Sequence, residues 1–189
     1  MFPYFLKEDE QLLVESFTRR WVINGPTSYV VSPFVQVHKR KALTLGVTEY
    51  LRVRNTLTGE IRNEVGPKLF FATASDDVVE KLSAIPLKKN QYVRILDTST
   101  GMIRVEKGEA TVYLTPTEKT PEKIEIGINV DDRVTVLVRD IVGGQLSLIT
   151  EKQVFIPSPT QEVVEVRKRI SLKKNQYVRL IDKGTVDVR

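Results

Sequence analysis

The sequence predicts an elongated all-β protein, built as a tandem array of about four and a half antiparallel hairpin units. The octapeptide Leu87–Arg94 recurs letter for letter as Leu172–Arg179, 85 residues later. Gly59, Gly101 and Gly143 each follow a turn-forming segment and are spaced 42 residues apart, which is close to half that distance. The segments between these turns alternate polar and apolar residues, the pattern of a half-buried strand.

A second turn marker keeps the same phase. Gly25, Gly66 and Gly108 follow one another at steps of 41 and 42 residues, and Thr150-Glu151 takes the fourth place. An aromatic marker, Tyr50, Tyr92 and Tyr177, runs alongside, with Val134 in its missing place. The glycines taken to define the turns are Gly25, Gly59, Gly66, Gly101, Gly108, Gly143 and Gly184.

These markers divide the chain into repeat units. The units are a divergent first repeat (1–41), three full repeats (42–84, 85–126 and 127–169) and a partial fifth repeat (170–189). A unit of this size is close to the limit below which isolated domains rarely stay folded, so each unit is expected to lean on its neighbours. The joints at 83–87 and 167–172 have almost no slack, which predicts stacking at a fixed angle.

Each unit is expected to hold several short strands in the same order. In the first two units we expect strands over 12–17, 19–23, 29–31, 49–54, 61–65 and 69–71. Gly25-Pro26 and Gly66-Pro67 turn the chain between them, because Gly tolerates positive φ and Pro presets its own. Residues 76–84 fit a helical turn or a strand, and analogy with the later units favours a strand.

The third and fourth units repeat this plan. Gly101 is expected to need a positive φ in its hairpin turn, and Pro116 to stop a strand because it cannot donate to a ladder. The expected strands are 91–97, 102–106, 111–114, 123–126, 133–138, 146–149, 154–156 and 163–166. The fifth unit begins near Ile170 and reaches Arg189 midway through its first hairpin.

Composition excludes several kinds of site. The chain has no cysteine, which excludes disulfides, thiolate chemistry and Cys-based zinc sites and fits a reducing compartment. No apolar run approaches the length of a membrane span, and the acidic start does not resemble a signal peptide. The net charge of +5 is mild for 189 residues.

Catalytic, cofactor and metal sites are not expected. The only histidine, His38, has no acidic neighbour in the sequence and no cysteine to share a metal with. Asp76-Asp77 and Asp131-Asp132 lie at predicted turns, where paired carboxylates usually cap a loop, and the spacing of a calcium loop is missing. Gly143-Gly144 is not followed by the Lys-Ser/Thr of a phosphate loop. These residues do not predict an enzyme.

Basic residues gather at the joints between units, and they have three readings. They suit lateral contact with another copy, or they discourage wrong pairing of strand edges, or they bind a nucleic acid or acidic partner. Interleaved acidic residues offer complementary charge to a neighbouring copy, so we favour lateral contact. The candidate contact residues are Lys39, Arg40, Lys41, Lys88, Lys89, Arg167, Lys168, Arg169, Lys173 and Lys174.

The third unit resembles the wall repeat of the major vault protein family. The likeness lies in an Ile-Pro start at 85–87, a Tyr strand ending in Asp at 92–97, the return 103–108 and the aromatic strand 112–114. Phe155–Ser158, followed by 163–166, is similar to the joint between vault repeats. A fainter likeness to band-7 (stomatin-like) domains is carried by Arg19-Arg20-Trp21 with Gly25-Pro26 and Gly66-Pro67, without the helices of that fold.

This resemblance implies a structural protein. In the vault family many copies of the chain stand side by side as staves and close a hollow cytoplasmic shell, a ribonucleoprotein particle. The implied partners are further copies of this chain, other shell proteins and RNA. Exposed edge strands point the same way, because they either carry features that block pairing or find a partner. The alternative is a monomeric β-repeat adaptor that binds a protein or nucleic-acid partner through its basic joints.

Overall fold

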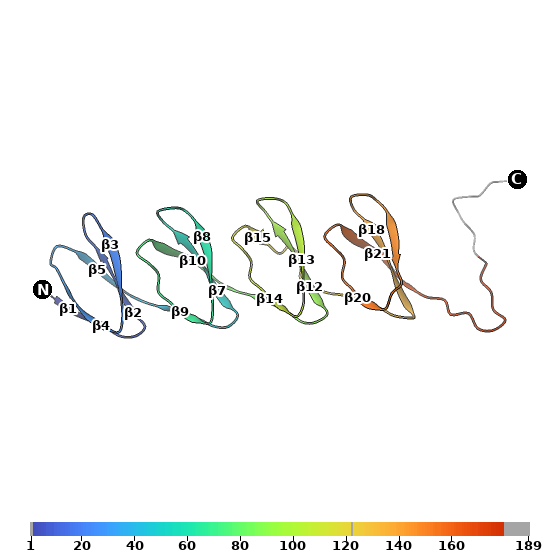
Figure 1. The fold of residues 1–189 in the computed structure, drawn as a ribbon, viewed down its shortest axis with the longest axis horizontal. Helices are drawn as coiled ribbons and strands as arrows, with labels where there is room; N and C mark the ends of the chain where they lie inside the picture. The colour runs from blue at the N-terminus through green and yellow to red at the C-terminus, as the bar shows by residue number, and fades with distance from the viewer. Residues whose placement is uncertain (1, 122, 180–189) are drawn as a thin grey trace. The chain divides into compact units, whose positions relative to one another are not determined.

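The computed structural model describes residues 2–121 and 123–179. These residues form strands and turns without any helix, in small antiparallel sheets that recur along the chain (Figure 1). The all-β repeat architecture expected from the sequence is therefore confirmed. In the described ranges there is accordingly no helix long and apolar enough to cross a membrane.

Each repeat has the same five parts, which we name by their order. An opening strand pairs with the fourth strand in a small two-stranded sheet, and a central strand pairs with a return strand on one side and a closing strand on the other. In repeat 1 these are β1 (Phe2–Leu6), β2 (Glu10–Glu15), β3 (Arg20–Asn24), β4 (Thr27–Val31) and β5 (Gln36–Lys41). In repeat 2 they are β6 (Leu43–Leu45), β7 (Glu49–Asn55), β8 (Ile61–Val65), β9 (Lys68–Phe70) and β10 (Asp76–Ser83).

The later repeats follow the same order. In repeat 3 the strands are β11 (Ile85–Leu87), β12 (Gln91–Asp97), β13 (Ile103–Lys107) and β14 (Ala110–Val112), and the closing strand is split into β15 (Glu118–Lys119) and β16 (Glu125–Ile126). In repeat 4 they are β17 (Ile128–Val130), β18 (Val134–Asp140), β19 (Leu146–Ile149), β20 (Gln153–Phe155) and β21 (Gln161–Lys168). The strand favoured for 76–84 is thus present as β10.

The core of each repeat is a cluster of apolar side chains at matching positions. One comes from the opening strand, two from the central strand and one from the fourth strand. They are Leu45, Leu51, Val53 and Phe70 in repeat 2, Leu87, Val93, Ile95 and Val112 in repeat 3, and Val130, Val136, Val138 and Phe155 in repeat 4. Repeat 1 buries Leu6, Leu12, Val14 and Val31 in the same way. Such a small core explains why a repeat needs its neighbours.

The structure shifts two of the repeat markers by one residue. Gly59, Gly101 and Gly144 have positive φ, whereas Gly143 occupies the same turn without it. In β18 the buried position that Tyr50 and Tyr92 fill belongs to Thr135 instead of Val134. The step from repeat 3 to repeat 4 is therefore 43 residues, so the third unit is one residue longer than the 42-residue spacing of Gly101 and Gly143 suggested.

The second copy of the octapeptide forms only part of the structure of the first. Lys173 and Gln176 close a turn like that of Lys88 and Gln91, but no strand forms in the described residues 170–179. The remainder of the predicted partial fifth repeat, with Gly184, lies outside the described residues.

The chain divides into two compact units. The first extends through Ile126 and holds repeats 1 to 3, and the second begins at Gly127 and holds repeat 4. The contacts described below lie within one unit or the other.

Candidate interaction surface

Repeats 1 and 2 are joined through Arg40. Its guanidinium donates to the carbonyl oxygens of Ala72 and Thr73 at 2.7 and 3.0 Å, and to Gln11 Oε1 at 2.6 Å. Gln11 lies on the face of the central strand that points away from the core of repeat 1. Arg40, predicted to contact another copy, is thus largely occupied in holding the next repeat of its own chain.

Repeats 2 and 3 meet at the matching place. Asn63 Nδ2 donates to the Leu114 carbonyl at 2.7 Å, and the Tyr113 hydroxyl donates to the Val47 carbonyl at 3.1 Å. The rings of Tyr50 and Tyr113 pack edge to face, with their centroids 5.6 Å apart. In both joints the three-stranded sheet of one repeat receives the loop after the fourth strand of the next. That face is therefore covered, and the strand edges remain.

An arginine–carboxylate cluster closes the open side of the repeat 2 core. Arg62 donates to both carboxylate oxygens of Asp76, at 2.9 and 2.8 Å, and through Nε to Glu64 at 2.9 Å. Only 1% of the Asp76 side chain is exposed. Burial acts to raise the pKa of Asp76, but hydrogen bonds from Arg62 and Thr73 outweigh it and hold that pKa below its usual value. The Arg62 pKa is raised by the same pairing.

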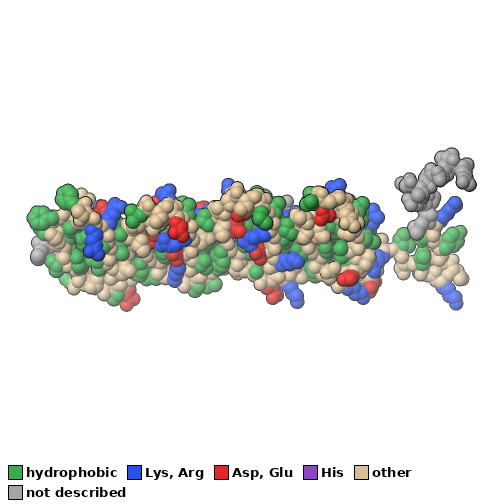
Figure 2. All heavy atoms as spheres, turned by 45° about the horizontal axis from the view of Figure 1, so that its top comes forward, with side chains coloured by type: hydrophobic (Ala, Val, Ile, Leu, Met, Phe, Trp, Pro, Cys, Tyr) green, Lys and Arg blue, Asp and Glu red, His purple; other side chains and the backbone are tan. Residues whose placement is uncertain are grey.

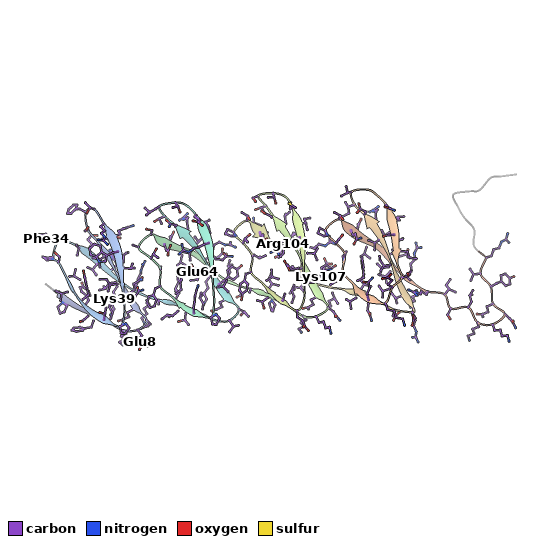
Figure 3. All side chains as sticks on the ribbon, viewed as in Figure 1. Glu8, Phe34, Lys39, Glu64, Arg104 and Lys107 are labelled. Carbon is purple, nitrogen blue, oxygen red and sulfur yellow. The ribbon has the colours of Figure 1, made fainter. Side chains whose placement is uncertain are left out.

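Repeat 3 has an equivalent cluster. Arg104 Nε donates to Glu118 at 2.8 Å, and its guanidinium also contacts Glu106. The hydrogen bond from Arg104 is the main cause of the lowered pKa of Glu118. In repeat 4 the corresponding residues are Ser147 and Gln161, so the arginine–carboxylate cluster does not recur in every repeat. Figure 2 shows basic and acidic side chains side by side on the repeats, and Figure 3 labels Glu64 and Arg104.

These contacts change the role of the acidic residues expected to meet a neighbouring copy. Glu118 pairs with Arg104, Glu162 with Arg139 at 2.6 Å and Glu165 with Arg167 at 2.7 Å. Each of these carboxylates therefore has a partner in its own repeat. The register between paired strands brings these partners together, and the sequence pattern alone did not reveal the pairing.

A recurring turn cap was missed by the sequence analysis. Glu49 accepts a hydrogen bond from the Gly46 amide, Gln91 from Lys88 and Gln176 from Lys173, at 2.8 to 3.0 Å. Glu10 caps Lys7 in the same way. The sequence does contain a sign of this cap, which is a Glu or Gln three residues after the first residue of the turn. The bond from Lys81, followed by that of the Gly46 amide, lowers the pKa of Glu49.

The basic residues of the first repeat lie along the closing strand. Lys39 Nζ pairs with Glu10 at 2.8 Å, and Lys41 Nζ lies 4.0 Å from Asp9. His38 is exposed on the same strand, and no group of three potential metal-ligating side chains occurs in the described part of the chain. Lys39, labelled in Figure 3, is thus paired with Glu10, the residue that caps the turn between β1 and β2.

The lysine pairs at the tight turns are the most accessible of the predicted contacts. Lys88 and Lys89 are exposed and make no ion pair with a described residue, and Lys173 and Lys174 occupy the matching turn. Repeat 4, however, places Asp131-Asp132 there, and Asp131 caps the turn through the amides of Arg133 and Val134. The turn position therefore changes sign between repeats.

The remaining basic candidates lie at the end of β21. Arg167 pairs with Glu165, Lys168 is exposed, and Arg169 donates to the Thr150 carbonyl. The structure thus divides the ten candidates between closing strands, where several are bound internally, and turns, where they are free to meet a partner.

The two edges of the sheets differ in regularity. The return strands β3, β8, β13 and β19 keep an unbroken register with their central strands and lie at the outer edge of each sheet. The closing strand is bulged after Val78 in β10 and at the matching place in β21, and in repeat 3 it is split. Bulges discourage edge-to-edge pairing. In repeat 1 the closing strand β5 also keeps an unbroken register. The return strand is therefore the edge that stays regular in all four repeats.

Comparison with known proteins leaves the family of the chain open. A scan against models of protein families gives no match, and a search of curated proteins gives none either. The likeness to vault wall repeats therefore stays an expectation carried by the motifs of this chain.

Proposed function

We propose that this chain is a structural protein whose copies pack side by side into a vault-like cytoplasmic shell or ring. The single observation that carries the proposal is the unbroken return-strand edge, which recurs in all four repeats. A regular edge strand presents unsatisfied backbone groups, and it is a ready template for another chain unless something covers it.

Side chains on both edges support the same proposal. Ile103 and Leu146 occupy matching places on β13 and β19 and are 42% and 57% exposed. On the closing side the bulge residues Val79 and Val164 are about half exposed. We expect the return edge of one copy to meet the closing side of the next through these apolar side chains, because the bulges of β10 and β21 discourage a backbone ladder there. Such a heterologous contact closes into a ring when the rotation between copies closes.

The adaptor function receives less support. Lys88-Lys89 is replaced by Asp131-Asp132 at the matching turn, and Arg40 is used inside the chain. A continuous basic track for a nucleic acid would need one sign of charge at successive turns.

Charge placed on the return edge tests the proposal. We expect Ile103→Lys and Leu146→Lys to shift the protein from large species to monomer in sedimentation velocity, because a lysine in that contact must be desolvated. Met102→Lys is the matched control, because Met102 is 71% exposed and lies in the turn just before β13. Edge variants that sediment like the control would overturn this assignment of the edge.

A further inference from the structure

The hairpin end of repeat 1 differs from that of the other repeats. In repeats 2, 3 and 4 a backbone hydrogen bond ties the hairpin turn to the loop before the closing strand. These bonds join Thr56 to Ser75 at 2.8 Å, Thr98 to Thr117 at 2.8 Å and Ile141 to Thr160 at 2.7 Å. Register places Phe17 and Phe34 at the two corresponding positions of repeat 1. No such bond joins these two residues, both of which are described.

The two loops of repeat 1 are open where the other three are tied. A cavity of about 440 Å³ lies between them, lined by Phe17, Pro33, Phe34 and Val35 among others. The rings themselves project outward, because Phe17 is 103% and Phe34 84% exposed. Figure 3 labels Phe34 in its loop, and Figure 2 shows hydrophobic side chains standing out from repeat 1. Rings that lined a groove for a peptide would be covered in part by that groove.

Positive charge accompanies these rings. Arg19 and Arg20 follow Phe17 after one intervening residue, Thr18, and Arg20 pairs with Glu15 at 2.6 Å. Arg19 makes no ion pair with a described residue, and its guanidinium lies 5.8 Å from the centre of the Trp21 ring. Projecting aromatic rings beside a guanidinium group suit the interface of an anionic bilayer, where the rings enter the apolar boundary and the cation meets lipid phosphate.

We propose that the hairpin end of repeat 1, formed by Phe17, Phe34 and Arg19, is a docking site for the surface of an anionic membrane. The contact is peripheral and needs no membrane span. It is independent of the lateral packing proposed above, because it uses loop tips and leaves the return-strand edges free.

Vesicle sedimentation of the full chain tests the site. We expect binding to phosphatidylcholine vesicles that contain phosphatidylserine, and weaker binding to pure phosphatidylcholine, because Arg19 adds an electrostatic attraction. Phe17→Ser and Phe34→Ser are each expected to weaken binding about tenfold, since each removes one inserted ring. Arg19→Gln is expected to weaken binding to the vesicles that contain phosphatidylserine, so that the variant binds the two kinds of vesicle more equally.

The matched control is Leu57→Ser, which removes an 83% exposed apolar side chain from the hairpin turn of repeat 2. It should bind vesicles like the original chain. Absence of vesicle binding by the original chain would overturn the proposal. So would an equal loss in Leu57→Ser and the two Phe variants, or equal binding to the two kinds of vesicle. Thermal unfolding of each variant checks whether these surface changes leave the repeats folded.

Discussion

Two neighbouring aspartates, Asp76 and Asp77, have the same chemistry and different surroundings. Asp76 is buried and accepts two hydrogen bonds from Arg62. Asp77 pairs with Arg54 at 2.8 Å, with both side chains about half exposed. Charged hydrogen bonds of buried groups stabilise far more than exposed ion pairs, which solvent screens.

We expect Asp76→Asn to lower the free energy of unfolding by about 2 kcal/mol, because it weakens a buried charged pair that also caps Thr73. Asp77→Asn is the control and should lower it by less than about 1 kcal/mol. Urea unfolding followed by circular dichroism measures both. Equal losses at the two positions would show that the buried cluster has no special role.

The same clusters predict a dependence of stability on pH. The pKa values of Asp76, Glu64 and Glu118 are lowered in the folded protein, so the unfolded chain binds more protons as the pH falls. Their contribution is present above the ordinary values, 3.8 for Asp and 4.5 for Glu, and is lost as the pH falls through the lower folded values. The urea midpoint should therefore drop between neutral pH and about pH 3. A midpoint that stayed constant over this range would contradict the assignment.

Charged residues show the limit of sequence reasoning at this scale. The sequence shows that Arg40 and Glu118 are charged and near joints, but their partners come from other strands. Arg40 reaches Ala72 and Thr73, and Glu118 meets Arg104. Those meetings depend on register between segments that are distant in the sequence, so local patterns could not predict which charges stay free.

At the scale of the element, the two copies of the octapeptide show which part of its structure is local and which part depends on other segments. Both copies form the turn, which depends on a Gln three residues along the chain. Only the first copy becomes a strand, because β12 has β13 and β16 beside it. Strand formation therefore requires partners that the octapeptide itself does not encode.

The glycines of the hairpin turns predict a contrast. Gly101→Ala should lower the free energy of unfolding by about 1 kcal/mol, because a Cβ is unfavourable at its φ of 72°. Gly143→Ala should be close to neutral, because a Cβ there meets only Asp140 Oδ1 at 3.6 Å. Thermal unfolding compares the two variants. A larger loss at Gly143 would mean that the turn of repeat 4 is built differently.

Strand prediction succeeded for several of the longer strands, although β1 and β5, with five and six residues, were missed. The seven-residue strand β12 matches the predicted range 91–97, and β19 matches 146–149. The opening strands β6, β11 and β17 have three residues each, too few for alternation to mark them. The split of the closing strand of repeat 3 also escaped notice, since Lys123–Ile126 alternates like an unbroken strand.

At the scale of the molecule, each repeat contributes both a small apolar core and one part of the candidate interaction surface. Each repeat buries a handful of apolar side chains, and the joints at Arg40 and at Asn63 link it to its neighbour in the first unit. The same plan gives every repeat a return strand of unbroken register at the edge of its sheet. The sequence revealed the repeat and its edges, but the irregularity of the closing strands of repeats 2, 3 and 4 emerged only from the register.

Sedimentation velocity of the original chain at low and high salt, with negative-stain imaging of the same samples, tests the central claim most directly. Lateral packing predicts large closed or curved assemblies at low salt. These should loosen as salt is raised, because it screens the exposed charges that help align the two edges. A single monomeric species under both conditions and at high protein concentration would contradict the claim, and it would move the function to a monomeric adaptor.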